Sequence, residues 1–179
     1  MKHQKTLIIA ALAPFALVAC DNTTTNAIAP TANATVSILD QCDSASFNAG
    51  LGAGTCMRAG NTTLSAFNAE LNATGRVAAW TFDPTSLTVQ LGQTITAMNN
   101  GGEDHTFTEV QQFGGGIVPA LNAASGNTTE TPECADITAA DHIKPGASMT
   151  TSAQTTIGVH RYQCCIHPWM RETVTVTGM

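Results

Sequence analysis

Hydrophobic and polar residues alternate with a period of two in the second half of the chain. In SLTVQL the apolar side chains are Leu87, Val89 and Leu91, and a Gly-Gln turn follows. The same alternation recurs near the C-terminus, where ETVTVTG carries Val174 and Val176. This period is typical of β-strands with one buried face, so both segments are predicted to be strands.

Other short segments of the same character lie between turn-forming residues. They are AAWTF, TITAM, HTFTEV and GVHRYQC, separated by an Asp-Pro break, the turn-rich NNGGED and a Pro-Gly turn. Short strands at this spacing predict an all-β protein with an antiparallel sandwich. The stretch 111–140 has little periodicity, and a loop of that length in a compact domain is usually functional or held by a covalent link.

The pattern is different in residues 36–76, where no independent domain is predicted. The part between Cys42 and Cys56 is rich in glycine and irregular. In TLSAFNAEL, Leu64, Phe67 and Leu71 stand at helical spacing, which predicts a short amphipathic helix.

The N-terminus has the pattern of an export signal. MKHQK is basic, and TLIIAALAPFALVA is apolar but too short for a comfortable membrane span. It ends at LVAC, which resembles the bacterial lipobox, in which the cysteine, here Cys20, is lipidated. Asp21 resembles the signal that retains lipoproteins in the inner membrane of enteric bacteria. We therefore expect an exported, lipid-anchored protein on the periplasmic or cell-surface side; the alternative is an ordinary secretory signal with a chance cysteine.

The polar segment DNTTTNAIAPTANAT follows Cys20 and is typical of a flexible tether. The expected organisation is a signal segment at 1–19, a tether at 20–35, an N-terminal extension at 36–76 and a strand-rich domain at 77–179.

Charge and cysteine content narrow the possible functions. The net charge is -6, only 11% of residues are charged, and there is no cluster of Lys and Arg to neutralise phosphates, which argues against nucleic acid. We expect a monomer. The chain has six cysteines, which after export survive as disulfides or as metal ligands. Setting Cys20 aside leaves an odd number, so one cysteine lies outside intramolecular disulfides, as a metal thiolate would.

The segment RYQCCIHPWM carries the most specific chemistry. Cys164, His167 and Met170 form C-x-x-H-x-x-M between two predicted strands, and His105 begins another predicted strand far upstream. One cysteine, two histidines and a weak thioether are the ligand set of a type 1 copper site. Met170 alone would be interpreted as a core residue, but the four residues together predict a copper site.

These residues resemble the cupredoxin family, which includes plastocyanin, amicyanin and pseudoazurin. The matching segments are NNGGEDHTF and GVHRYQCCIHPWMRETVTV, and the resemblance covers about residues 77–179. Family members take one histidine from a strand end and three ligands from one loop before the last strand. The resemblance implies a Greek-key β-sandwich in which one copper ion, cycling between Cu(II) and Cu(I), is held by four residues: His105, Cys164, His167 and Met170.

Other metal sites fit the spacing less well. A c-type haem needs C-x-x-C-H, and this motif does not occur in the chain. The dinuclear copper site of cytochrome oxidase subunit two needs two thiolates separated by three residues, whereas Cys164 and Cys165 are adjacent. Structural zinc needs four strong ligands, and one cysteine, two histidines and a methionine supply only three. A Cys-His acyl-transfer site would need an oxyanion motif, and none is apparent.

The four remaining cysteines allow three pairings. Successive side chains on a strand point to opposite faces, so Cys165 faces away if Cys164 faces the metal. We expect Cys42 to pair with Cys56 in a local loop, and Cys134 to pair with Cys165, which would fasten the long insertion to the ligand loop. Cross-pairings such as Cys42 with Cys134 stay open.

The resemblance implies one-electron transfer to a redox protein that docks transiently. In the family, electrons pass through the ring edge of the second histidine, which reaches the surface in an apolar patch; here this implies His167, with Pro168 and Trp169 beside it. The alternative is a copper storage or delivery module without a redox partner. Nitrite reduction would need a second copper type with its own histidines; His142 and His160 lack ligand spacing, and no catalytic residues are expected.

Overall fold

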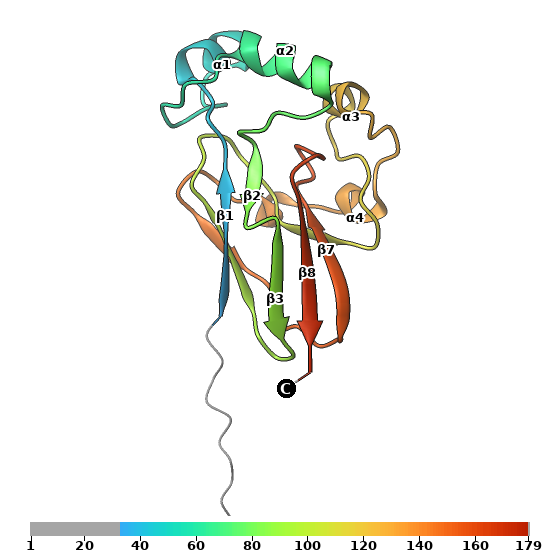
Figure 1. Cartoon of the computed structure of the whole chain (residues 1–179). Helices are drawn as coiled ribbons and strands as arrows, with labels where there is room; N and C mark the ends of the chain where they lie inside the picture. The colour runs from blue at the N-terminus through green and yellow to red at the C-terminus, as the bar shows by residue number, and fades with distance from the viewer. Residues whose placement is uncertain (1–32, 179) are drawn as a thin grey trace, which may run out of the picture.

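The computed structural model describes residues 33–178; the signal segment, Cys20 and all but the last three residues of the expected tether lie outside the described residues. Two four-stranded sheets form a sandwich (Figure 1). The strand orders are β2-β1-β4-β6 and β3-β8-β7-β5. The strands are β1 (Ala34–Leu39), β2 (Thr81–Asp83), β3 (Ser86–Gln90), β4 (Ile95–Asn99), β5 (Thr108–Val110), β6 (Ser148–Thr150), β7 (Gly158–Gln163) and β8 (Arg171–Thr177).

The alternation in the sequence decides which side chains fill the space between the sheets. In β8, Val174 and Val176 are buried while Thr175 and Thr177 are exposed, and in β3 Val89 is buried. Burial of such apolar side chains is the main favourable contribution to folding. The predicted all-β sandwich is therefore confirmed.

The sheets are mixed, whereas the turn pattern predicted an antiparallel arrangement. β1 runs parallel to β4, with Ala34 opposite Ile95, and β3 runs parallel to β8, with Ser86 opposite Thr173. The reason is that the chain changes sheet after β2, β3, β4, β5 and β6, so most strand neighbours within a sheet are not joined by tight turns. Only a tight hairpin forces antiparallel pairing.

The N-terminal segment belongs to the sandwich, and here the structure differs from the expected division of the chain. β1 lies between β2 and β4 in one sheet, so the sandwich begins at Ala34, within the expected tether, rather than at Val77. The strand is short and has two fully buried apolar residues, Val36 and Ile38. Two such positions give a weak period-two signal, which explains why the sequence pattern did not predict it.

Two helices of this segment cover one end of the sandwich, where β8 begins, while the C-terminus lies at the other end (Figure 1). They are α1 (Ser44–Leu51) and α2 (Leu64–Thr74), and α2 confirms the predicted amphipathic helix. Phe47 from α1 and Phe67 from α2 pack on Trp80, with ring centroids 5.9 Å and 4.8 Å away. The helices are thus held to the sandwich by an aromatic cluster.

The long stretch 111–140 forms short helices pinned to the ligand loop. It contains α3 (Pro119–Ser125), α4 (Pro132–Ala135) and the beginning of the 3-10 helix η1 (Ala139–Asp141). A disulfide joins Cys134 to Cys165, and the Ile117 N–H donates to the Cys165 carbonyl at 2.7 Å. Cys42 and Cys56 form the second disulfide, so both expected pairings are present. Within residues 33–178, no helix is long and apolar enough to cross a membrane.

Glu172 is an unusual core residue that generates a testable prediction. Its side chain is fully buried on the inner face of β8, and neither carboxyl oxygen has a hydrogen-bond partner among the described residues. Burial raises the pKa of Glu172 to about 8, because a charge without a partner is poorly solvated there.

We expect Glu172→Gln to stabilise the protein at alkaline pH and to have little effect at low pH. Wild-type stability from this group is fully present below the ordinary pKa of 4.5 and is lost as the pH rises through about 8, because the unfolded chain releases the proton more easily. At pH 9 the variant should be more stable by on the order of 3 kcal/mol, measured by denaturant unfolding. Glu130→Gln, at an exposed position, is the control; a difference independent of pH would contradict the assignment.

Candidate metal centre

Parallel pairing of β1 and β4 brings two inward-facing polar residues to the same end of the sheet. The alternation that buries Val36 and Ile38 continues to Asp40, which is buried just after β1. In β4 the buried positions Ile95 and Ala97 are followed by buried Asn99. Buried polar groups are normally hydrogen-bonded. Asp40 and Asn99 form their hydrogen bonds with the turn that follows β4 and thereby hold it in place.

Asn99 fixes this turn through three hydrogen bonds. Its side-chain amide donates to the Glu103 carbonyl at 2.8 Å and to the Ile143 carbonyl at 2.6 Å, and its Oδ1 accepts from the Gly101 N–H at 2.9 Å. His105 follows in an isolated bridge: its N–H donates to the Ile143 carbonyl, and its carbonyl accepts from the Ile143 N–H. The predicted strand HTFTEV therefore becomes regular only at Thr108, and His105 lies at its approach.

The other site residues lie in the loop between β7 and β8. The Cys164 N–H donates to the Met170 carbonyl at 3.0 Å, and the Met170 N–H donates to the His167 carbonyl at 2.9 Å. These two bonds close the C-x-x-H-x-x-M segment into a compact loop. The loop is fastened to the upstream segment because the Cys165 N–H donates to the Thr106 hydroxyl at 2.8 Å.

Three of the predicted ligands converge. His105, Cys164 and His167 offer donor atoms that all lie within 4.8 Å of one another, and all three residues are buried. The Cys164 Sγ is 3.7 Å from Nδ1 of His105 and 3.8 Å from Nδ1 of His167. Within residues 33–178 this is the one group of three or more His, Cys, Asp or Glu side chains positioned to hold a metal ion.

The spacing of these atoms fits a metal ion, such as copper, held by one sulfur and two nitrogen donors. Metal bonds of about 2.3 Å to sulfur and about 2.0 Å to nitrogen, separated by about 120°, place sulfur and nitrogen about 3.7 Å apart. The two measured separations, 3.7 and 3.8 Å, agree with that value. Met170, the predicted fourth ligand, is buried at the end of the same loop. The residues present therefore fit the group that the sequence predicted.

The electrostatics of the cluster favour a thiolate beside the two imidazoles. Burial raises the pKa of the Cys164 thiol, but hydrogen bonds from His105 and His167 outweigh burial and hold that pKa well below its usual range. The Thr106 N–H also points at the sulfur, 3.4 Å away. The thiolate is the form of cysteine that binds metal, so the cluster is electrostatically prepared for a cation.

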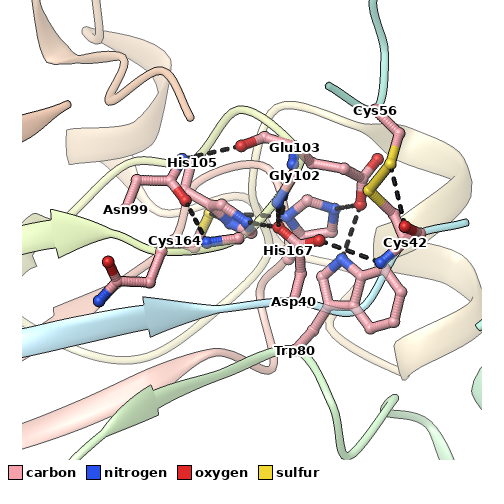
Figure 2. A network of polar contacts seen from close by, with 12 residues as sticks. Asp40, Cys42, Cys56, Trp80, Asn99, Gly102, Glu103, His105, Cys164 and His167 are labelled. Atoms are coloured by element: carbon pink, nitrogen blue, oxygen red, sulfur yellow. Dashed lines mark hydrogen bonds and ion pairs between the residues drawn. A yellow bond between two sulfur atoms is a disulfide. The ribbon is translucent and has the colours of Figure 1, made fainter. Parts of the chain in front are cut away.

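Each imidazole carries a carboxylate behind it, on the side away from Cys164 (Figure 2). Nε2 of His105 lies 2.9 Å from Oδ2 of Asp40, and both side chains are fully buried. Nε2 of His167 lies 3.6 Å from Oε2 of Glu103, which accepts a hydrogen bond from Nε1 of Trp80 at 2.7 Å.

These carboxylates shift the acid–base balance of the site. Burial raises the pKa of Asp40, but the hydrogen bonds from His105 and from backbone N–H groups outweigh it and hold the pKa well below its ordinary value. Burial lowers the pKa of His105, whereas Asp40 and the Cys164 thiolate raise it, with a net value of about 9. Burial raises the pKa of Glu103.

The outer face of the site differs from the exposed ring edge implied by the resemblance. His167 is only 3% exposed and Pro168 is buried, while Trp169 is half-buried with its ring centroid 5.5 Å from that of His167. Phe67 of α2 packs against Trp169 at 6.0 Å. The N-terminal segment therefore helps to cover the second histidine. A surface pocket of about 360 Å³, lined in part by Gly54, still reaches His167.

The two other histidines of the described residues, His142 and His160, lie outside the cluster. His142 pairs with Asp104 at 2.7 Å, and His160 pairs with Glu109 at 2.6 Å. Neither was predicted to be a ligand. Asp40, Glu103 and Trp80 were not predicted from the sequence. For Asp40 a signal existed, because Ile38 and Val36 stand two and four positions before it in TVSILD.

The arrangement of the site residues matches the one that the resemblance implied. His105 comes from the approach to a strand, and Cys164, His167 and Met170 come from one loop before the last strand, β8. With two sheets in a sandwich, this makes the fold cupredoxin-like.

Among known proteins, this chain is similar to several solved structures. No family model and no curated protein matches the chain. A novel purple cupredoxin from Nitrosopumilus maritimus is similar with 15% identity and a TM-score of 0.45, covering 81% of this chain and 100% of that chain. A Cu(I) form of an amicyanin mutant is similar with 19% identity and a TM-score of 0.38, covering 57% of this chain and 78% of that chain. An oxidised amicyanin mutant shows 22% identity and a TM-score of 0.34, covering 52% of this chain and 70% of that chain.

The adjacent cysteines should give opposite results when they are substituted. Cys164→Ser should abolish the intense visible thiolate-to-copper band, because serine cannot supply the sulfur donor. The double variant Cys134→Ser, Cys165→Ser should keep the band but lose about 2–4 kcal/mol of stability with its disulfide. Absorption spectra after addition of Cu(II) and denaturant unfolding measure the two effects. A band that survives in Cys164→Ser would disprove the assignment of the thiolate.

Proposed function

We propose that this protein is a lipid-anchored type 1 copper protein that carries single electrons between redox partners outside the cytoplasm. The supporting observation is the convergence of the Cys164 Sγ with Nδ1 of His105 and His167 in a buried cluster. When bound by these residues and Met170, copper supplies a centre that gains and loses one electron.

The protein's own contribution is to hold the donors in fixed positions away from water. His105 is fixed through its backbone by Ile143 and through its ring by Asp40. Cys164 directly follows β7, is fully buried and donates its N–H to the Met170 carbonyl. Because these contacts hold the donors in place, bound copper would gain or lose an electron with little movement of its ligands, which would favour rapid transfer.

Electrons would leave the site on the side of His167. The pocket that reaches this residue and the half-buried ring of Trp169 are the two routes to the surface. The low overall content of charged residues suits a transient complex with a weakly charged redox protein. We propose an electron carrier rather than an enzyme, acting as a monomer.

Export is supported by the cysteines. The two disulfides are the covalent links expected in an oxidising compartment. Lipid attachment at Cys20, with retention in the inner membrane favoured by Asp21, is part of the proposal and rests on the lipobox-like segment alone.

One observation favours the alternative, copper storage or delivery without a redox partner. His167 is 3% exposed, so the ring edge that the family uses for electron exit is covered. A covered centre suits retention of a metal ion, as storage or delivery would require.

Loading with Cu(II) separates the two functions. For the chain from Asp21 onward, we expect an intense visible thiolate-to-copper band that bleaches with a reductant and returns with an oxidant. Reversible bleaching requires that both oxidation states are held by the same ligands. A colourless complex, or one that is reduced irreversibly, would favour storage or delivery instead. The Cys164→Ser variant, which lacks the thiolate, is the matched control.

A further inference from the structure

Asp40 is a fully buried carboxylate that accepts four hydrogen bonds. Its Oδ2 accepts from the Gly102 N–H at 2.8 Å and the Glu103 N–H at 3.0 Å, and it lies 2.9 Å from Nε2 of His105. Its Oδ1 accepts from the Cys42 N–H at 3.1 Å. No water is needed to satisfy this group, because protein donors occupy both oxygens (Figure 2).

This arrangement decides which ring nitrogen of His105 carries a proton. An ionised carboxylate only accepts hydrogen bonds, so Nε2 must be the donor to Asp40. A ring that binds copper is neutral, so with the proton on Nε2 its lone pair is on Nδ1, the nitrogen that lies 3.7 Å from the Cys164 Sγ. A carboxylate behind a metal-binding histidine also raises the basicity of the ring.

We infer that Asp40 is a positioning residue of the copper centre, which fixes the tautomer of His105 and lowers the reduction potential of the bound copper. The inference rests on the proposed function. It adds a residue from the N-terminal segment, outside the part of the chain that resembles small cupredoxins. Its physical basis is that a negative charge and a more basic imidazole stabilise Cu(II) more than Cu(I).

The surrounding segment is built closely around this carboxylate. A side chain at Gly101 would collide with Oδ2 of Asp40, and a Cβ at Gly102 would lie 2.6 Å from Sγ of Cys42. The disulfide to Cys56 thus packs against the turn that donates to Asp40. β1 on one side and this disulfide loop on the other leave Asp40 little freedom to move.

Glu103 shows by contrast why Asp40 is the stronger candidate. Its Oε2 is 3.6 Å from Nε2 of His167, beyond ordinary hydrogen-bond length, and its donor is Trp80. Asp40 makes the shorter contact, has more donors and is the more deeply buried of the two carboxylates.

The experiment compares Asp40→Asn with Asp43→Asn in the copper-loaded protein. Both substitutions remove one negative charge from the same segment, but Asp43 caps α1 through Ser46, a role that asparagine fills equally well. We expect Asp40→Asn to keep the visible band and to weaken Cu(II) relative to Cu(I) at least about tenfold. For a one-electron couple this raises the reduction potential by about 59 mV, measured by spectroelectrochemistry, and Asp43→Asn should leave it unchanged.

Equal potentials in the two variants, with the band intact, would overturn the role of Asp40 while leaving the proposed function in place. A wild-type protein without the band would instead remove the proposed function.

A measurement on the wild-type protein covers the case in which Asp40→Asn does not fold. In the Cu(I) form labelled with ¹⁵N-histidine, NMR should show a proton on Nε2 of His105 that exchanges slowly with water, and an unprotonated Nδ1. A protonated Nδ1, or rapid exchange at Nε2, would overturn the inference. His160, whose ring is paired with Glu109 near the surface, is the internal control and should exchange faster.

Discussion

Burial of charge is the constraint on which the rest of this structure depends. A thiolate, two imidazoles and two carboxylates lie at one end of the sandwich with almost no contact with water. Ionised groups are costly to bury unless each is paired and hydrogen-bonded. The structure meets this requirement by placing Asp40 behind His105 and Glu103 near His167, with backbone N–H groups and Trp80 completing the carboxylate shell. The parallel strands β1 and β4, the Cys42–Cys56 disulfide and the aromatic cluster all contribute to holding these partners in place.

The adjacent cysteines illustrate how one backbone rule separates two functions. Cys164 and Cys165 directly follow β7, and their side chains reach different partners, as strand alternation would give if it continued past Gln163. Cys164 meets the two imidazoles, whereas Cys165 is bonded to Cys134 in the insertion. The ligand loop is therefore joined covalently to α4, and the insertion becomes part of the support of the site.

Much of the sandwich and the central donors could be predicted from the sequence, because they depend on local patterns. Period-two alternation located β3 and β8, and the C-x-x-H-x-x-M spacing located the ligand loop. The odd number of cysteines outside the signal segment pointed to a thiolate. What could not be predicted depends on long-range pairing. β1 has only two fully buried apolar residues, its parallel partner is about sixty residues away, and Asp40 becomes a partner of His105 only once both strands are in register. The burial of His167 likewise depends on a long-range contact, the packing of Phe67 from α2 on Trp169, which helical spacing alone does not specify.

The direction of β1 places the start of the described chain and the metal centre at opposite ends of the sandwich. The strand enters the sheet at Ala34, at the end where the chain also finishes, and runs towards the end that carries α1, α2 and the metal centre (Figure 1). Six residues of strand cover about 20 Å, so the attachment point of the N-terminal segment and the donor cluster lie at opposite poles. A partner that docks at the donor cluster therefore approaches the pole opposite Ala34, and does not compete for the same face with whatever the N-terminal segment is attached to.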